Sequence, residues 1–107
     1  MIIEAVTIKL YAPWVHSLKE KRMIVKSLID KTKNKFNVSI SEVDEQDVHQ
    51  TIVLGLACVT GTISHADSMI DSILTYIENN IDAQIIGRVE EGKKSLTIKS
   101  EFGEFNY

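Results

Sequence analysis

The residues best able to do chemistry lie just before the first helical segment and in an acidic connector near the middle of the chain. Imidazoles and carboxylates can ligate divalent ions or act as acids and bases, and the candidates are His16, Asp44, Asp47 and His49. No pair of them has a recognised metal-ligand spacing such as H-E-x-x-H. Solvated carboxylates paired with nearby lysines are the competing interpretation, and no residue is predicted to be catalytic.

Cations are concentrated in one predicted helix. It holds seven of the 12 lysines and arginines, although the whole chain has a net charge of −3. At helical spacing one flank carries Lys19, Arg22, Lys26 and Lys33, and Lys21 lies close by in sequence. A row of this kind is suited to following a phosphate backbone, so these five residues are the candidates for nucleic-acid binding. An ordinary solvated helix face is the alternative.

The charges of the two predicted helices raise a second question. Three cations fall in the first two turns of the first helix, where the helix dipole prefers anions. Either the acidic connector neutralises them, or an anionic partner does. The second helix carries Asp67, Asp71 and Glu78 on one flank. Helices of opposite charge also suit self-association, so a purely structural, self-associating domain remains an alternative.

Hydrophobic periodicity predicts the elements that position these residues. Strands that are apolar on both faces are expected over residues 2–11 and 51–60. A strand that is polar on one face should begin at Phe36 and contain a bulge near Glu42. A fourth strand is expected over residues 83–90. The first helix should begin at a capping box formed by Ser17 and Glu20 and run to about Lys35. The second should be capped by Ser64 and end at Asn79-Asn80. A turn at Glu91-Gly92-Lys93 would fold Ser95 to Lys99 back as a fifth strand.

This order predicts an α+β fold, a ferredoxin-like β-α-β-β-α-β sandwich. The antiparallel sheet would have the order 4-1-3-2, with two helices on one face and a possible fifth strand at the C-terminus. A single domain is expected over residues 1–107, with a core over 1–90 and a C-terminal hairpin or tail over 91–107. The start of the first helix and the acidic connector should lie at one end of the sheet, and His65 at the other.

The helix-free face of that sheet would expose apolar side chains from both central strands. The C-terminal segment, a second subunit or a ligand could cover it, and a homodimer is expected. RNA-recognition domains use this face, but they need aromatic residues in the central strands, and only Tyr11 is present.

Composition and motifs exclude several classes of protein. Cys58 is the only cysteine, so no disulfide or cysteine-rich zinc site is possible within the chain, and its apolar surroundings predict a buried thiol. Neither a membrane span nor a signal peptide is predicted, which favours the cytoplasm. No nucleophile elbow, P-loop or dinucleotide turn occurs, and the segment from Ala12 to His16 lacks the phosphate loop of acylphosphatases. The sequence therefore favours a non-enzymatic binding module without a cofactor.

Two runs of residues carry a family resemblance. They are Ser17-Leu18-Lys19-Glu20-Lys21-Arg22 and Phe36-Asn37-Val38-Ser39-Ile40-Ser41-Glu42-Val43-Asp44, the second followed by Gln46-Asp47. Over roughly residues 1 to 90 the chain resembles the YlxP-like family of small bacterial proteins of unknown function. The resemblance implies a ferredoxin-like fold. Because members are often encoded beside translation and ribosome-maturation factors, it also implies a role with RNA or the ribosome. It brings no catalytic residues.

The chain departs from the family pattern in two places. His49 stands where an aromatic residue is expected, and the tail beyond Glu91 is longer than usual. The longer tail suggests that this member covers its sheet in its own way.

Overall fold

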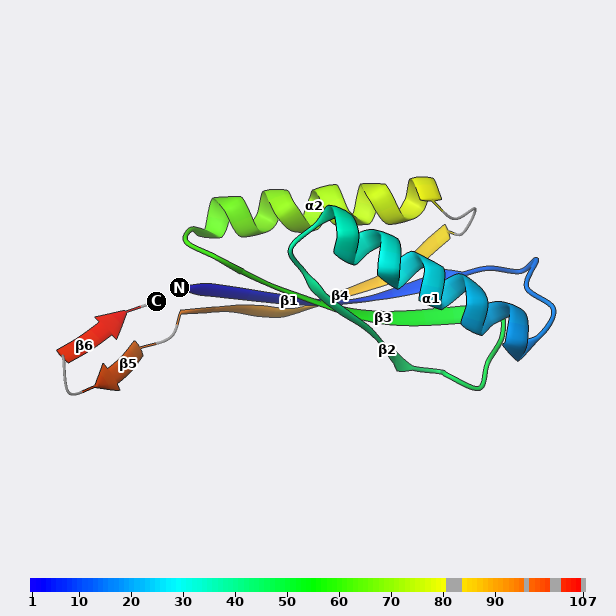
Figure 1. The fold of residues 1–107 in the computed structure, drawn as a ribbon, viewed down its shortest axis with the longest axis horizontal. Helices are drawn as coiled ribbons and strands as arrows, with labels where there is room; N and C mark the ends of the chain where they lie inside the picture. The colour runs from blue at the N-terminus through cyan, green and yellow to red at the C-terminus, as the bar shows by residue number, and fades with distance from the viewer. Residues whose placement is uncertain (81–83, 96, 101–102, 107) are drawn as a thin grey trace.

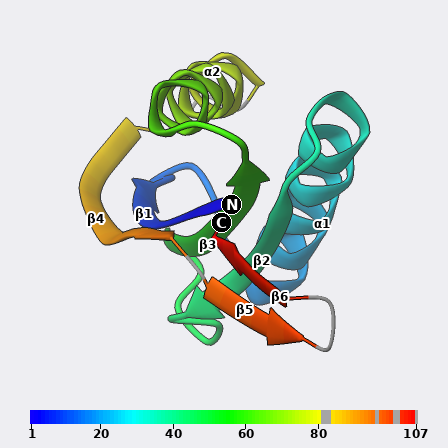
Figure 2. The ribbon, with the colours of Figure 1, turned by 90° about the vertical axis from the view of Figure 1, so that its left-hand side faces the viewer.

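The fold is described from a computed structural model, which describes residues 1–80, 84–95, 97–100 and 103–106, with side chains for residues 1–80. The elements in chain order are β1 (Ile2–Tyr11), α1 (Leu18–Lys35), β2 (Ser39–Asp44), β3 (Thr51–Thr60), α2 (Ile63–Asn80), β4 (Gln84–Ser95), β5 (Thr97–Ser100) and β6 (Gly103–Asn106). Four strands form one antiparallel sheet in the order β2-β3-β1-β4. Both helices cover the same face of it (Figure 1; Figure 2). The predicted α+β ferredoxin-like class is confirmed.

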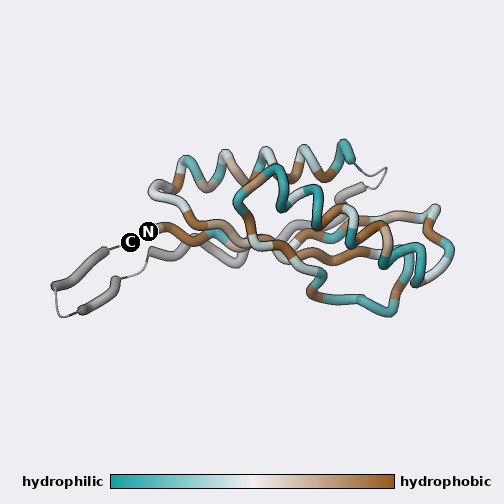
Figure 3. Tube along the Cα trace, viewed as in Figure 1, coloured by the Kyte–Doolittle hydropathy of each residue, from teal (hydrophilic) through white to brown (hydrophobic). Residues whose placement is uncertain are grey.

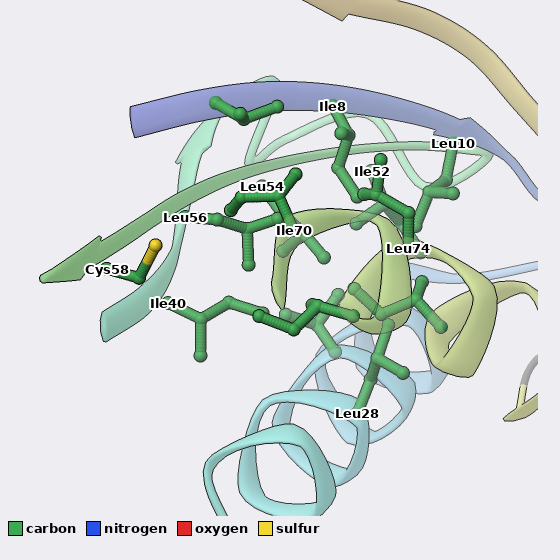
Figure 4. Packing of buried hydrophobic residues seen from close by; sticks show 14 of the residues in the cluster. Ile8, Leu10, Leu28, Ile40, Ile52, Leu54, Leu56, Cys58, Ile70 and Leu74 are labelled. Carbon is green, nitrogen blue, oxygen red and sulfur yellow. The ribbon is translucent and has the colours of Figure 1, made fainter. Parts of the chain in front are cut away.

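The core lies between the two central strands and the helices. Side chains alternate between the two faces of a strand, and the even-numbered residues 4–10 of β1 and 52–60 of β3 are buried on the face that the helices cover. Val53, on the other face, is buried as well. Ile8 pairs with Leu54 and Leu10 with Ile52, so large aliphatic side chains meet across the strands. Figure 3 shows the hydrophobic course of β1 and β3, and Figure 4 shows Ile70, Leu74 and Leu28 packing on them from the helices. This packing sets the helices at fixed positions on the sheet.

Helix α1 begins and ends near the predicted residues. The Ser17 hydroxyl accepts a hydrogen bond from the Glu20 amide at 3.1 Å, and the Glu20 carboxylate accepts one from the His16 amide at 3.3 Å. The return bond thus reaches one residue earlier than in a standard capping box. At the other end the Phe36 amide donates to the Thr32 carbonyl. Phe36 therefore caps the helix, and β2 begins later than predicted.

The predicted bulge in β2 is confirmed. Glu42 pairs with Leu54, but Asp44 pairs with the next residue, Val53, so Val43 is the extra residue. Val43 lies over Gly55, where a Cβ would come within 2.8 Å of its Cγ1 atom. A residue without a side chain is needed at position 55 for this close approach.

Two local predictions are wrong. Helix α2 begins at Ile63 and is capped by Thr62, not Ser64, because the Thr62 hydroxyl accepts from the His65 amide at 3.1 Å. The turn expected at Glu91-Gly92-Lys93 is absent. Strand β4 continues to Ser95 with Ala5 opposite Gly92 and Val6 opposite Glu90, and Glu91 forms a bulge. A glycine between charged residues is typical of a turn, but here pairing with β1 holds the chain extended.

The C-terminal strands do not join the main sheet. β5 and β6 pair with each other, antiparallel, as a separate two-stranded sheet. The expected fifth strand is therefore half of a hairpin that projects beyond the end of the sheet where β1 begins (Figure 1).

Candidate nucleic-acid interface

The start of α1 and the connector between β2 and β3 meet at one end of the sheet. The segment before α1 is tied to the connector by two hydrogen bonds. The Ala12 amide donates to the Gln50 carbonyl at 2.8 Å, and the Gln50 side-chain amide donates to the Pro13 carbonyl at 3.2 Å. Charged residues from α1 and from the connector are therefore neighbours, while His65 lies at the far end, at the start of α2 (Figure 1).

Lys21 is the most constrained charged residue in this region. Its side chain is 1% exposed, and its ammonium donates to the carbonyls of Glu45 and Val48, both at 2.6 Å. The Glu42 carboxylate forms an ion pair with it at 2.9 Å. A buried ammonium is tolerated only where polar partners replace its water, and two carbonyls and one carboxylate do so here.

The connector that Lys21 holds is a tight turn. Glu45 has a φ of 51°, in the left-handed region, and its amide is bonded to the Asp44 carboxylate at 2.8 Å. Its carbonyl accepts from the Val48 amide at 3.1 Å as well as from Lys21. Lys21 therefore pins the turn to α1, and its role is structural. Because the residue is buried and engaged, it is removed from the predicted nucleic-acid-binding set.

The remaining four candidate cations are exposed. They are Lys19, Arg22, Lys26 and Lys33. The ion pairs within residues 1–80 join Lys21 to Glu42 and Lys9 to Glu45, and neither includes a member of this set. Glu42 of β2 thus neutralises one of the three early cations of α1, and Lys19 and Arg22 take part in no ion pair within residues 1–80. We call these four residues the exposed flank.

Part of the exposed flank borders a groove between α1 and β2. Arg22 and Lys26 line it, with Val25 and Ile29 on the helix and Ser41 on the strand. The groove also includes Asp30 and Glu42, so its charge is mixed, although Glu42 is paired with Lys21. Two cations beside a hydroxyl and a strand edge can bind an anionic backbone that lies along the helix.

The geometry of the candidate ligands gives no support to the predicted metal site, and an acid-base role for them stays a prediction. Within residues 1–80, which include every candidate ligand, no three His, Cys, Asp or Glu side chains gather closely enough to hold an ion. Asp44 is engaged with the amide of the following residue. His16 and Asp47 are exposed, and His49 is half-buried. The four candidate ligands belong to segments at one end of the sheet, but they do not form one coordination sphere. They are His16, Asp44, Asp47 and His49.

Lys35 and the thiol of Cys58 have structural surroundings. Lys35 lies over the Tyr76 ring of α2 with its ammonium 4.8 Å from the centroid, and Phe36 packs edge-on against the same ring at 5.6 Å. Cys58 is buried, as predicted. Burial raises the pKa of its thiol, and the negative charge of Glu4 raises it further. Such a thiol is a poor nucleophile.

Sequence reasoning placed Lys21 among the binding candidates, although a signal for its burial exists. Lys21 follows Leu18 by three residues and precedes Val25 by four, which is the spacing of the buried stripe of α1. A lysine inside an apolar stripe predicts a buried contact, whereas the identity of its partners depends on the path of the connector.

Comparison with known proteins identifies relatives and a similar fold. The family model described as "Protein of unknown function (DUF503)" matches residues 3–89. The uncharacterized protein YlxP of Bacillus subtilis (strain 168) is 38% identical over 63 residues, which cover 59% of this chain and 68% of that protein. A de novo designed protein with a ferredoxin fold, solved by NMR, matches with a TM-score of 0.62 and 24% identity over 86% of this chain and 87% of its own. That likeness concerns the fold alone. Among the described residues, no helix has the length and hydrophobicity needed to cross a membrane.

Proposed function

The chain belongs to the DUF503 family of proteins of unknown function, and within this family we propose that it is a non-enzymatic module that binds structured RNA through the exposed flank of α1. Ribosomal RNA is the first candidate, in the cytoplasm. The proposal rests on a difference between the cations near the start of α1: some are paired with carboxylates, and others are exposed without an ion pair among residues 1–80. The carboxylates of Glu42 and Glu45 are paired with Lys21 and Lys9. Lys19, Arg22, Lys26 and Lys33 stay exposed.

The spacing of the exposed flank supports contact with a phosphate backbone. At 100° per residue its four members fall within a fan of about 60°, and from Lys19 to Lys33 the helix rises about 21 Å. A row of this length passes several successive phosphates. The net charge of −3 gives the rest of the chain no attraction for RNA, so binding should depend on this row alone.

The proposed mode is recognition of backbone and shape. Double-stranded RNA presents a sugar-phosphate surface that proteins read without stacking on bases. Stacking would require aromatic side chains on the helix-free face of the sheet, and among the described side chains of β1, β2 and β3 that face offers only Tyr11, which is 41% exposed. The helix is therefore the better surface.

A charge-reversal pair tests the proposal against its matched control. Arg22→Glu with Lys26→Glu should weaken binding to a structured RNA hairpin by at least about tenfold at ~50 mM salt, where phosphate contacts are strongest. Lys31→Glu with Lys35→Glu changes the net charge equally on another side of α1 and should weaken binding by less than about threefold. Fluorescence anisotropy measures both affinities, and far-ultraviolet circular dichroism checks the fold.

Two results would reject the proposal. One is the absence of RNA binding by the unaltered protein at that salt concentration. The other is an equal loss in both double variants, which would mean that net charge matters and the position of the charges does not.

A further inference from the structure

A cleft lies between the two helices, where they diverge. Near the end of α1 the helices are in contact, because the Phe36 ring packs edge-on against the Tyr76 ring of α2. Toward the start of α1 they separate (Figure 1). The cleft has a volume of ≈390 Å³, and its described lining comes from Trp14 in the segment before α1, from one side of α1, and from Asn80 at the end of α2.

The walls of the cleft are largely apolar. Leu28 is 1% exposed and Met23 is 66% exposed, while Trp14 and Ile24 are half-buried. Trp14 and Ile24 pack against the core, so the core supports both side chains. The unbranched side chain of Met23 can adapt to the shape of a ligand. An indole ring beside aliphatic side chains favours a ligand with a flat, apolar body.

Two hydrogen-bond donors of α1 lie one turn apart at this cleft. Lys31 follows Ser27 by four residues, which places both on the same side of the helix. Within residues 1–80 the Lys31 ammonium is in no ion pair and the Ser27 hydroxyl in no hydrogen bond. The hydroxyl of Thr32, by contrast, donates to the Leu28 carbonyl. An ammonium and a hydroxyl can together donate to the two oxygens of one carboxylate.

The charge of the described lining favours an anion. Lys31 is the one ionisable side chain among the lining residues that the structure describes. An anion that binds beside these apolar walls gains a charge-assisted hydrogen bond where water is partly excluded. The position also separates this cleft from the exposed flank, because nine residues, or a rotation of about 180°, lie between Arg22 and Lys31.

The size of the cleft favours a small molecule. From Met23 to Lys31 the helix rises about 12 Å, and a second helix of that length and a diameter of ~10 Å has a volume of about 900 Å³. The cleft holds less than half of that volume. Sites for small molecules begin at about 300 Å³, so a ligand of two or three fused rings fits.

We infer that the cleft between α1 and α2 binds a small aromatic carboxylate. Its rings lie against Trp14, Ile24 and Met23, and its carboxylate accepts hydrogen bonds from Lys31 and Ser27. This site uses none of the exposed flank, so it does not depend on the proposed binding of RNA.

Trp14 makes the site directly observable, because it is the single tryptophan of the chain. Anthracene-9-carboxylate absorbs light at the wavelengths where tryptophan emits, so the bound probe should quench Trp14 fluorescence until one molecule is bound per chain. Anthracene-9-carboxamide has the same rings without the charge. It should bind at least about tenfold more weakly, because the charge-assisted hydrogen bonds are lost.

Three variants test the residues of the cleft. Lys31→Met should weaken binding of the carboxylate probe by at least about tenfold and leave the affinity for the carboxamide unchanged. Lys35→Met is the matched control, because its ammonium lies one turn further along α1, over the Tyr76 ring, and it should change either affinity by less than about twofold. Ser27→Phe fills the cleft from an exposed position and should abolish binding of both probes. Far-ultraviolet circular dichroism checks the fold of each variant.

Four results would each overturn the inference. They are the absence of saturable quenching, equal affinities for the carboxylate and the carboxamide, equal losses in Lys31→Met and Lys35→Met, and unchanged binding in a folded Ser27→Phe variant. An affinity for the probe that falls as the protein concentration is raised would assign the cleft to a second copy of the chain, and would also overturn it.

Discussion

Lys21 and Arg22 are consecutive residues of the same helix, yet the structure places them in opposite environments. Lys21 is buried, with two carbonyls and one carboxylate around its ammonium. Arg22 is exposed and takes no part in the ion pairs within residues 1–80. The comparison teaches that in this helix the angular position of a cation, and not its charge or sequence neighbourhood, decides whether it holds the fold or is available to a partner.

The physical cause is the 100° rotation between successive helical residues. Lys21 falls on the stripe with Val25, Leu28 and Thr32, all buried, and its long side chain passes along that stripe to reach the connector. Arg22 falls next to it, beside the groove that α1 forms with β2. A single positive charge thus stabilises the fold at Lys21 and faces solvent at Arg22.

The largest expected effect comes from removing the buried charge. Lys21→Met keeps the length of the side chain but leaves Glu42 and two connector carbonyls without their cation. Such an uncompensated buried charge should lower the free energy of unfolding by about 3–5 kcal/mol. Urea denaturation followed by the fluorescence of Trp14, the single tryptophan, measures the loss.

Arg22→Met is the matched control for that experiment. An exposed residue without a partner should change the unfolding free energy by no more than about 0.5 kcal/mol. Equal losses in the two variants would break the comparison, because they would show that both cations contribute to stability in the same way.

A smaller effect should come from the carboxylate of the buried pair. Glu42→Gln removes the negative charge but leaves both carbonyl acceptors, so it should cost less than Lys21→Met, about 1–3 kcal/mol. Because the two residues are in contact, the double variant should show a coupling energy of about 1–3 kcal/mol in a double-mutant cycle. Additive losses would mean that the carbonyls hold Lys21 without help from Glu42.

Much of the fold was predictable because its signals are local. Pro13 and Ser17 mark the gap between β1 and α1, and the odd step at Val43 marks the bulge. Gly92 misled because a glycine between charged residues resembles a turn, while the pairing that keeps it extended comes from β1, about 90 residues away in the chain. Cross-strand pairing of that range leaves no trace in a local pattern.

The candidate site was predictable to a different extent. Helical spacing alone places Lys19, Arg22, Lys26 and Lys33 on one flank, whose role with RNA stays a prediction. The error at Lys21 arose because its partners are backbone carbonyls of Glu45 and Val48, and carbonyls are identical in every residue. Only the path of the connector, with its left-handed residue, determines where those oxygens lie.

The smallest expected effect concerns the salt dependence of RNA binding and tests the role of the exposed residue, Arg22. Arg22→Gln should lower the slope of log affinity against log salt by about 1, because one phosphate contact is lost, and should leave the unfolding free energy unchanged. Lys21→Met should leave the slope of log affinity against log salt unchanged, because a buried ammonium releases no counterion. This variant is measured at a temperature below the midpoint of its thermal unfolding. Titrations of one RNA hairpin at several salt concentrations give both slopes. If the slope falls for Lys21→Met and not for Arg22→Gln, the assignment of one cation to the fold and the other to the partner is reversed.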